Sequence, residues 1–202
     1  MPHHHWHHTH EEAGMHSSLC GPCAVGKSAP DFDMEAVMPG GEGAARFGRI
    51  SLEDIKKSGR WTVLYFYPRD FTFICPTEIR KFNELYDQFK ENNAEVVAVS
   101  TDSTFSHLKW QETDLGKLNH PHAADPSGKV SMAYGVYVPE DGLALRGTFI
   151  IPPQGDLYSY SISHDGVGRS VEEVLRLLEA SQAAASGKRM PCEWQPGEKT
   201  RP

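Results

Sequence analysis

The sequence predicts a single α/β domain built around a mixed β-sheet, and two patterns carry this prediction. Two apolar segments, 61–67 and 96–100, have the composition of buried strands and are separated by a helical stripe of apolar residues. A strand, a helix and a second strand within about 40 residues are typical of a parallel βαβ unit. Further along, the segments 147–151 and 157–163 flank a Pro-Pro-Gln-Gly-Asp turn, which predicts an antiparallel hairpin.

The βαβ unit has clear boundaries. Residues 61–67 are β-branched or aromatic and mostly apolar on both faces, as in a central buried strand, and Pro68 ends the run. From Glu78 onward the apolar residues form one helical stripe that contains Ile79, Phe82, Leu85, Tyr86 and Phe89.

Two further helices are expected. One begins near Ser103 and carries the apolar residues Phe105, Leu108 and Leu115. The last begins at Ser170, where Glu173 follows three residues later and completes the pattern of a capping box. Its apolar face consists of Val171, Val174, Leu175 and Leu178.

Length and composition exclude several classes of protein. A chain of 202 residues with 39% hydrophobic residues is long enough for one domain plus tails and too apolar to be wholly disordered. A net charge of -7 without a basic run excludes an electrostatic nucleic-acid binder. The longest apolar run is far shorter than the roughly 20 residues that a membrane helix needs. Four cysteines are too few for a disulfide-built scaffold.

The chain divides into three expected parts. Residues 1–24 are a His-rich extension, which we expect to be disordered, because seven of the eleven histidines lie in its first 16 residues without periodicity. This extension is either a solvated tail, native or vector-derived, or a segment that adsorbs metal ions. Residues 25–185 form the α/β domain, and residues 186–202 form an extended tail rich in Pro and Gly.

One cysteine lies where a thiolate is favoured. Cys75 falls between the buried strand and the long helix, and Pro76 suits the first helical turn. Unpaired N–H groups and the positive end of the helix dipole stabilise an anion at that place. The thiolate is the nucleophile, and it is the form that peroxides oxidise. The alternative is a buried, inert cysteine.

The segment Pro68-x-x-x-Thr72-x-x-Cys75 resembles the active-site loop of the typical 2-Cys peroxiredoxins, the AhpC-like group of the AhpC/TSA family. Further segments resemble that family in the same order, so the resemblance extends from 25 to 200; they are 25–32, 98–103, 125–128 and 145–151. The resemblance implies a thioredoxin-like peroxiredoxin fold, in which a central mixed sheet is flanked by helices.

The resemblance also implies roles for individual residues. Cys75 is then the peroxidatic cysteine, Thr72 holds the peroxide, and Arg146 places a permanent positive charge beside the sulfur. Pro68 shields the site, and Glu78 orients Arg146. The alternative is that Pro68 and Thr72 are turn residues, and that Arg146 and Glu78 form a surface pair worth under about 1 kcal/mol.

The resemblance points to Cys192 as the resolving cysteine, most naturally from a partner subunit. Alignment on Trp194-x-Pro-Gly places the family's cysteine at Met190, so this chain carries its cysteine two residues later. The alternative is a one-Cys enzyme that an external thiol reduces directly.

The motif Cys20-Gly-Pro-Cys23 has the sequence of a thioredoxin redox motif but lacks the strand before it and the helix after it. Three interpretations stay open. The two thiols are exposed without a role, they form an auxiliary disulfide that relays electrons, or they bind zinc together with His10 or His16.

The resemblance implies a thiol peroxidase that reduces hydrogen peroxide and alkyl hydroperoxides, with no metal or organic cofactor. Its expected reductant is thioredoxin or an AhpF-like flavoprotein, and its expected assembly is a homodimer or a ring of dimers such as a decamer. We expect a cytoplasmic enzyme, because no secretory signal precedes the domain and its thiols must be re-reduced. A holdase chaperone and a metal-sequestering protein are the rival interpretations.

Overall fold

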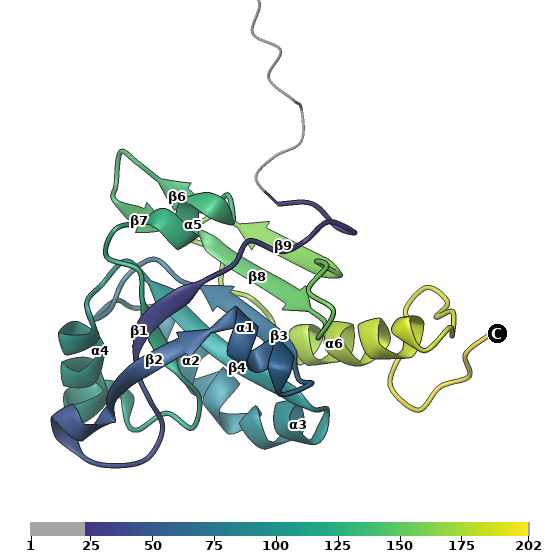
Figure 1. The fold of residues 1–202 in the computed structure, drawn as a ribbon, viewed down its shortest axis with the longest axis horizontal. Helices are drawn as coiled ribbons and strands as arrows, with labels where there is room; N and C mark the ends of the chain where they lie inside the picture. Colours follow the sequence, from purple (N-terminus) through teal and green to yellow (C-terminus); the bar gives the residue numbers. More distant parts are fainter. Residues whose placement is uncertain (1–22, 202) are drawn as a thin grey trace, which may run out of the picture.

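The computed structural model describes residues 23–201, and a mixed β-sheet forms its centre (Figure 1). Within that range the sheet has seven strands in the order β2-β1-β5-β4-β3-β8-β9. The strands are β1 (Asp33–Val37), β2 (Phe47–Ser51), β3 (Trp61–Phe66), β4 (Ala94–Ser100), β5 (His122–Ala124), β8 (Arg146–Ile151) and β9 (Ser159–Ser163). A separate small hairpin consists of β6 (Tyr137–Val138) and β7 (Leu143–Ala144).

The centre of the sheet confirms the predicted mixture of parallel and antiparallel pairs. β3 runs parallel to β4 with Val63 opposite Val96, and β4 runs parallel to β5. β8 is antiparallel to β3 and forms the predicted hairpin with β9. Every residue of β3 and β4 is buried, as expected for strands that are covered on both faces.

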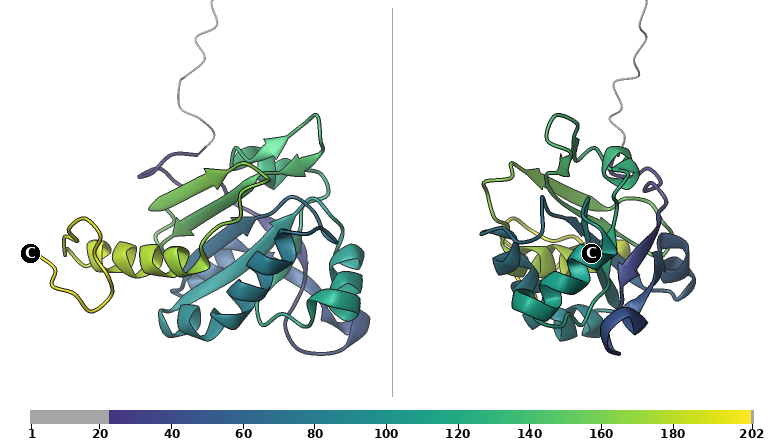
Figure 2. Two further views of the ribbon diagram at one scale, coloured as in Figure 1. Left: turned by 180° about the vertical axis from the view of Figure 1, so that it is seen from behind. Right: turned by 90° about the vertical axis from the view of Figure 1, so that its left-hand side faces the viewer.

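Helices cover both faces of the sheet (Figures 1 and 2). One face packs against α2 (Cys75–Glu84), α3 (Tyr86–Glu91) and α6 (Val171–Ala185), and we call the resulting cluster of buried residues the first core. The other face packs against α1 (Leu52–Lys57) and the region of α5 (Lys129–Ala133), which form the second core. The remaining helical segments are η1 (Gly43–Arg46), α4 (Thr104–Trp110) and the π-helical turn η2 (Gln111–Leu115).

The helix after β3 begins at Cys75, where Pro76 predicts its first turn, but it differs from the prediction in one way. It breaks at Leu85 into α2 and α3. The apolar stripe continues across the break because both short helices pack on the same face of the sheet. Hydrophobic periodicity therefore does not reveal the interruption.

Helix α4 begins after Ser103 as predicted, but its apolar residue Phe105 does not face the interior. Phe105 is 72% exposed, and its ring lies edge-on to Phe47. The helix instead buries Thr104, His107 and Trp110, so two polar residues occupy its inner face. A pattern of hydrophobicity alone could not indicate this, because His107 is polar and yet fully buried.

Helix α6 begins at Ser170 as predicted, but only half of the capping box forms. The Ser170 hydroxyl accepts a hydrogen bond from the backbone N–H of Glu173 at 3.2 Å. The Glu173 carboxylate accepts from the guanidinium of Arg176 and so does not return to the cap.

The C-terminal segment is not the extended tail that its composition predicts. Arg189 and Arg201 exchange two backbone hydrogen bonds, so the segment closes into a loop. Trp194 is only 5% exposed, and Arg176 of α6 donates to its carbonyl oxygen at 2.9 Å. A large aromatic side chain that finds a packing site thus orders a segment rich in Pro and Gly.

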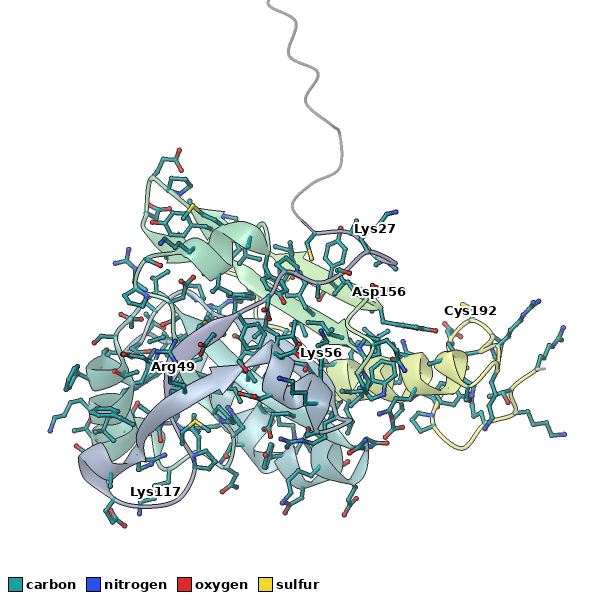
Figure 3. All side chains as sticks on the ribbon, in the orientation of Figure 1. Lys27, Arg49, Lys56, Lys117, Asp156 and Cys192 are labelled. Carbon is teal, nitrogen blue, oxygen red and sulfur yellow. The ribbon has the colours of Figure 1, made fainter. Side chains whose placement is uncertain are left out.

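Only the last two residues of the N-terminal extension, 23 and 24, are among the described residues. The His-rich region and Cys20 lie outside them, and so does the segment that we expect to be disordered. From residue 26 the chain pairs with the turn after β8, since Gly26 donates to Leu157 and Ala29 donates to Gly155. Lys27 and Asp156 lie near this junction (Figure 3). No helix among residues 23–201 is long and apolar enough to cross a membrane.

Replacing Ser170 by Ala should destabilise the protein by about 1 kcal/mol, because the N–H of Glu173 loses its acceptor. The measurement is the urea unfolding midpoint at unchanged m-value. Ser170→Thr retains the hydroxyl and should stay close to the wild type. Equal midpoints for all three proteins would contradict the assignment of the cap.

Candidate active site

Cys75 is the first residue of α2, directly after the segment 68–74, which we call the pocket loop. Pro76 lies within the first turn, as predicted, and no side chain caps this end of the helix. The Cys75 side chain is buried, with 1% exposure. The thiol therefore lies at the positive end of a helix in a site that little water reaches.

Arg146 reaches Cys75 from the neighbouring strand β8. Its Nη1 lies 3.4 Å from Sγ of Cys75 and 2.6 Å from Oε2 of Glu78. Its Nε donates to the carbonyl oxygen of Asp165 at 2.7 Å, and the residue is 4% exposed. This geometry excludes the interpretation of Arg146 and Glu78 as a surface pair.

A second arginine, which the sequence did not single out, completes the group. Arg169 donates to Oε1 of Glu78 from its backbone N–H at 2.8 Å and from Nε at 3.0 Å. It also donates to the carbonyl oxygen of Gly147 and to the hydroxyl of Thr148. In the sequence, Arg169 is marked only by its position before the N-cap Ser170. This position does not reveal which residues Arg169 contacts.

The charges of this group do not cancel. The carboxylate of Glu78 lies between two guanidinium groups, those of Arg146 and Arg169. One positive charge therefore remains, and Arg146 directs it at Sγ of Cys75. An anionic sulfur would neutralise it, and electrostatic stabilisation is strong where water is excluded.

A small pocket of about 240 Å³ opens onto the sulfur and is lined by Pro68, Arg69, Thr72, Phe73, Ile74, Cys75, Leu143, Arg146 and Asp165. Four of the predicted site residues thus meet at one pocket, namely Pro68, Thr72, Cys75 and Arg146. Glu78 does not line the pocket and acts on it through Arg146. The Thr72 hydroxyl donates to the carbonyl oxygen of Arg69 at 2.9 Å.

Cys192 is exposed and does not belong to this pocket. Helix α6 begins next to the site, just after Arg169, and its 15 residues extend about 22 Å. Cys192 lies in the C-terminal loop beyond the far end of that helix (Figure 3). A disulfide requires the two Cα atoms within about 7 Å, so the pair does not meet within this chain.

Cys23 lies apart from Cys75 as well. It is partly buried and packs against the second core, whereas Cys75 belongs to the first core on the opposite face of the sheet. Burial raises the pKa of the Cys23 thiol, which makes it less reactive. Its neighbour in the motif, Cys20, and the zinc ligands proposed with it lie outside the described residues.

The family model described as "AhpC/TSA family" matches residues 25–159. The chain belongs to this family. It is 47% identical over 182 residues to peroxiredoxin tpx1 of Schizosaccharomyces pombe, covering 87% of this chain and 91% of that one. It is 43% identical over 187 residues to a thioredoxin peroxidase of Trypanosoma brucei rhodesiense, covering 90% and 91%. A solved structure, the reduced 2-Cys peroxiredoxin of Plasmodium vivax, superposes with a TM-score of 0.80 at 34% identity and covers 87% of this chain and 91% of that one.

These similarities confirm the family, the thioredoxin-like fold and the class of enzyme that the sequence predicts. The protein is a peroxiredoxin and a peroxidase. The match to the family model includes the pocket loop, α2 and β8, because these lie within residues 25–159.

Replacing Glu78 by Gln should destabilise the folded protein by about 3 kcal/mol. The variant leaves two buried guanidinium groups without a counter-charge. The measurement is equilibrium unfolding in urea.

The matched control is Glu84→Gln, the same chemical change on the same helix. Glu84 pairs with Lys81 at the surface, where such pairs contribute under about 1 kcal/mol. Similar losses in the two variants would contradict the central place of Glu78.

Proposed function

We propose that the protein reduces hydrogen peroxide and small alkyl hydroperoxides at Cys75 and returns to the reduced state through a disulfide with Cys192. The observation that carries the proposal is the position of Arg146. Its Nη1 lies 3.4 Å from Sγ of Cys75 and donates a hydrogen bond to Glu78, which holds it in place. The pocket above the sulfur suits a substrate of a few heavy atoms.

In the first step the Cys75 thiolate attacks one oxygen of the peroxide. The S–O bond forms as the O–O bond breaks, and the leaving oxygen takes a proton to give water or an alcohol. The sulfur loses two electrons and becomes a sulfenic acid. Arg146 stabilises the negative charge as it moves from sulfur to the leaving oxygen, because its guanidinium remains charged throughout.

Two residues of the pocket loop assist the substrate. The Thr72 hydroxyl donates to the carbonyl oxygen of Arg69, so its own oxygen is directed to accept a hydrogen bond from the peroxide. Such a bond aligns the O–O axis with the sulfur. Pro68 lines the pocket without an N–H group and helps to keep water from the thiolate.

In the second step the Cys192 thiol attacks the sulfenic sulfur, so that a disulfide forms and water leaves. Because Cys192 lies beyond the far end of α6 in its own chain, the reacting pair is Cys75 of one protomer and Cys192 of its partner. Strand β9 ends the sheet with exposed side chains at Tyr160 and Ile162, which supports pairing with a second copy. A ring of such dimers is the expected larger assembly.

A dithiol reductant closes the cycle by exchange with the exposed Cys192 sulfur. We propose thioredoxin or an AhpF-like flavoprotein for this role. Continuous regeneration of thiols requires a reducing compartment, and this supports the cytoplasm.

Arg146→Ala should lower the second-order rate constant for hydrogen peroxide by about a hundredfold or more, because the group facing the reacting sulfur is lost. Stopped-flow measurement of Cys75 oxidation reports this constant. Arg60→Ala, at an arginine bound to Glu95 away from the pocket, is the control and should react like the wild type. An unchanged rate in Arg146→Ala would refute the role of Arg146.

One equivalent of hydrogen peroxide should produce a covalent dimer on a non-reducing gel, and mass spectrometry should find Cys75 joined to Cys192. Cys192→Ser should abolish this dimer and accumulate the sulfenic acid, which a dimedone label detects. If Cys75 is found joined to Cys20 or Cys23, those cysteines replace Cys192 in the cycle. Turnover of Cys192→Ser at the wild-type rate with thioredoxin would support the one-Cys scheme instead.

A further inference from the structure

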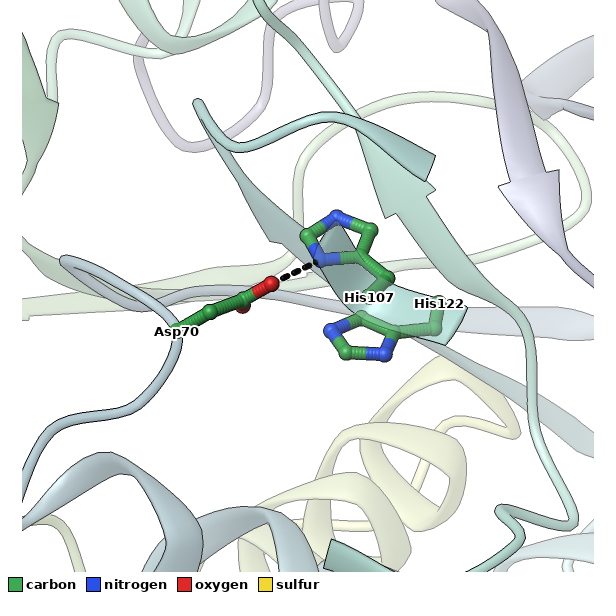
Figure 4. A group of neighbouring side chains, drawn as sticks. All are labelled: Asp70, His107 and His122. Carbon is green, nitrogen blue, oxygen red and sulfur yellow. Dashed lines mark hydrogen bonds and ion pairs between the residues drawn. The ribbon is translucent and has the colours of Figure 1, made fainter. Parts of the chain in front are cut away.

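A buried polar network lies beside the pocket loop and has no part in the reaction described above. Asp70 of the loop, His107 of α4 and His122 of β5 lie close together inside the protein (Figure 4). Asp70 is 7% exposed, and both histidines are 0% exposed. Buried ionisable groups are unfavourable unless they are paired. The contacts of each group therefore indicate which atoms donate and which accept hydrogen bonds in the network.

The Asp70 carboxylate ties the pocket loop to its surroundings. Its Oδ1 accepts from the hydroxyl of Tyr67 at 2.6 Å, and its Oδ2 accepts from Ser106 at 2.8 Å. Oδ2 also lies 2.8 Å from Nδ1 of His107. The backbone N–H of Asp70 donates to Asp102 at 2.9 Å. The loop is thus fastened to the end of β3, to the segment after β4 and to α4.

The contacts of His107 fix its protons. Its Nε2 lies 3.0 Å from the carbonyl oxygen of Ala123, which can only accept, so Nε2 carries a proton. Its Nδ1 lies 2.8 Å from Oδ2 of Asp70, so one proton is held between the two groups. One buried hydrogen bond thus joins α4 to the pocket loop inside the protein.

A second chain of hydrogen bonds fixes the other histidine. Arg46 donates to Oε1 of Gln111 at 2.7 Å, so the amide NH₂ of Gln111 faces Nδ1 of His122 at 3.0 Å. Nδ1 of His122 then accepts, and its Nε2 proton points at the oxygen of Tyr67. Tyr67 in turn donates to Asp70. Along this series of hydrogen bonds, each group donates to the next one in the direction from Arg46 to Asp70.

These protons argue against a metal ion in the same place. One ligand atom each of Asp70, His107 and His122 lies within 4.8 Å of the others, which is close enough for a shared ion. A metal needs a free lone pair on each nitrogen, yet each nitrogen that faces the centre already takes part in a hydrogen bond, with Asp70 or with Tyr67. Burial and the charge of His107 lower the pKa of His122 well below its usual value, so the neutral Nε2–H form persists.

The backbone next to Asp70 indicates what the network does. Phe71 has a φ of 56° and a side chain that is 57% exposed. A residue other than Gly adopts this left-handed conformation only where its surroundings impose it. Asp70 supplies that constraint on one side of Phe71, and Thr72 of the pocket follows on the other.

We propose that Asp70 is a positioning residue that holds the pocket loop closed, so that Thr72 and Pro68 stand over Cys75 in the geometry that peroxide requires. The inference rests on the proposed function of Cys75. The proposal adds that Tyr67, Ser106 and His107, which lie outside the pocket, hold the pocket loop in place through their contacts with Asp70. Release of Asp70 removes the alignment of the substrate and at the same time uncovers the sulfur.

The test compares two reactions of Cys75 in the full-length protein, with Asp70→Ala as the first variant. Its second-order rate constant for hydrogen peroxide should fall by about tenfold to a hundredfold, because alignment is lost. The rate of Cys75 alkylation by iodoacetamide, followed on the Cys75 peptide by mass spectrometry, should rise several-fold, because access improves. A purely structural role would not move the two rates in opposite directions.

The second variant, Tyr67→Phe, removes only one hydroxyl and serves if Asp70→Ala does not fold. It should show the same opposite changes, because Asp70 loses one donor and the N–H of His122 loses its acceptor. Its matched control is Tyr65→Phe, two residues earlier, within β3. The Tyr65 hydroxyl is buried and has no hydrogen-bond partner among the described residues, so both rates should stay at the wild-type values.

Three results would overturn the inference. They are unchanged rates in both folded variants, a parallel fall of both rates, and a stoichiometric zinc ion in the wild type that His122→Asn loses. A wild-type protein that does not react with peroxide would overturn the proposed function instead. The alkylation rates would still report whether Asp70 closes the loop.

Discussion

The site depends on one buried carboxylate, that of Glu78. It binds Arg146 on β8 and Arg169 ahead of α6, so it joins three segments that lie far apart in the sequence. Without it, two guanidinium groups would remain buried without a counter-ion, which is among the least favourable arrangements in a protein interior. The same bond that stabilises the packing of α2 therefore also determines where Arg146 meets Cys75.

Two polar groups of different character flank the pocket. The group around Glu78 has an excess of one positive charge and directs it at the sulfur. The group around Asp70 does not line the pocket and holds the loop through hydrogen bonds with Tyr67, Ser106 and His107. Stabilisation of charge and control of loop geometry are thus assigned to separate residues, so one can change without the other.

The sequence predicted the βαβ unit, the hairpin and the start of α6, because apolar periodicity and turn residues are local signals. It also predicted that Cys75 begins a helix, since Pro76 marks that position. It did not predict Arg169 or the buried inner face at His107, because a polar residue that is buried by its partners looks like a surface residue in the sequence. The order of the C-terminal loop was missed for a related reason, since Trp194 is fixed by a contact with the distant Arg176.

The two cores on opposite faces of the sheet have a consequence for electron transfer within one subunit. Thiol–disulfide exchange is a contact reaction in which the sulfur atoms must collide. Cys75 packs on one face, and Cys23 packs on the other. The sheet therefore separates the two sulfur atoms. Exchange between a disulfide at Cys23 and the oxidised Cys75 requires the chain to bring the sulfur atoms together around the edge of the sheet, or a second subunit.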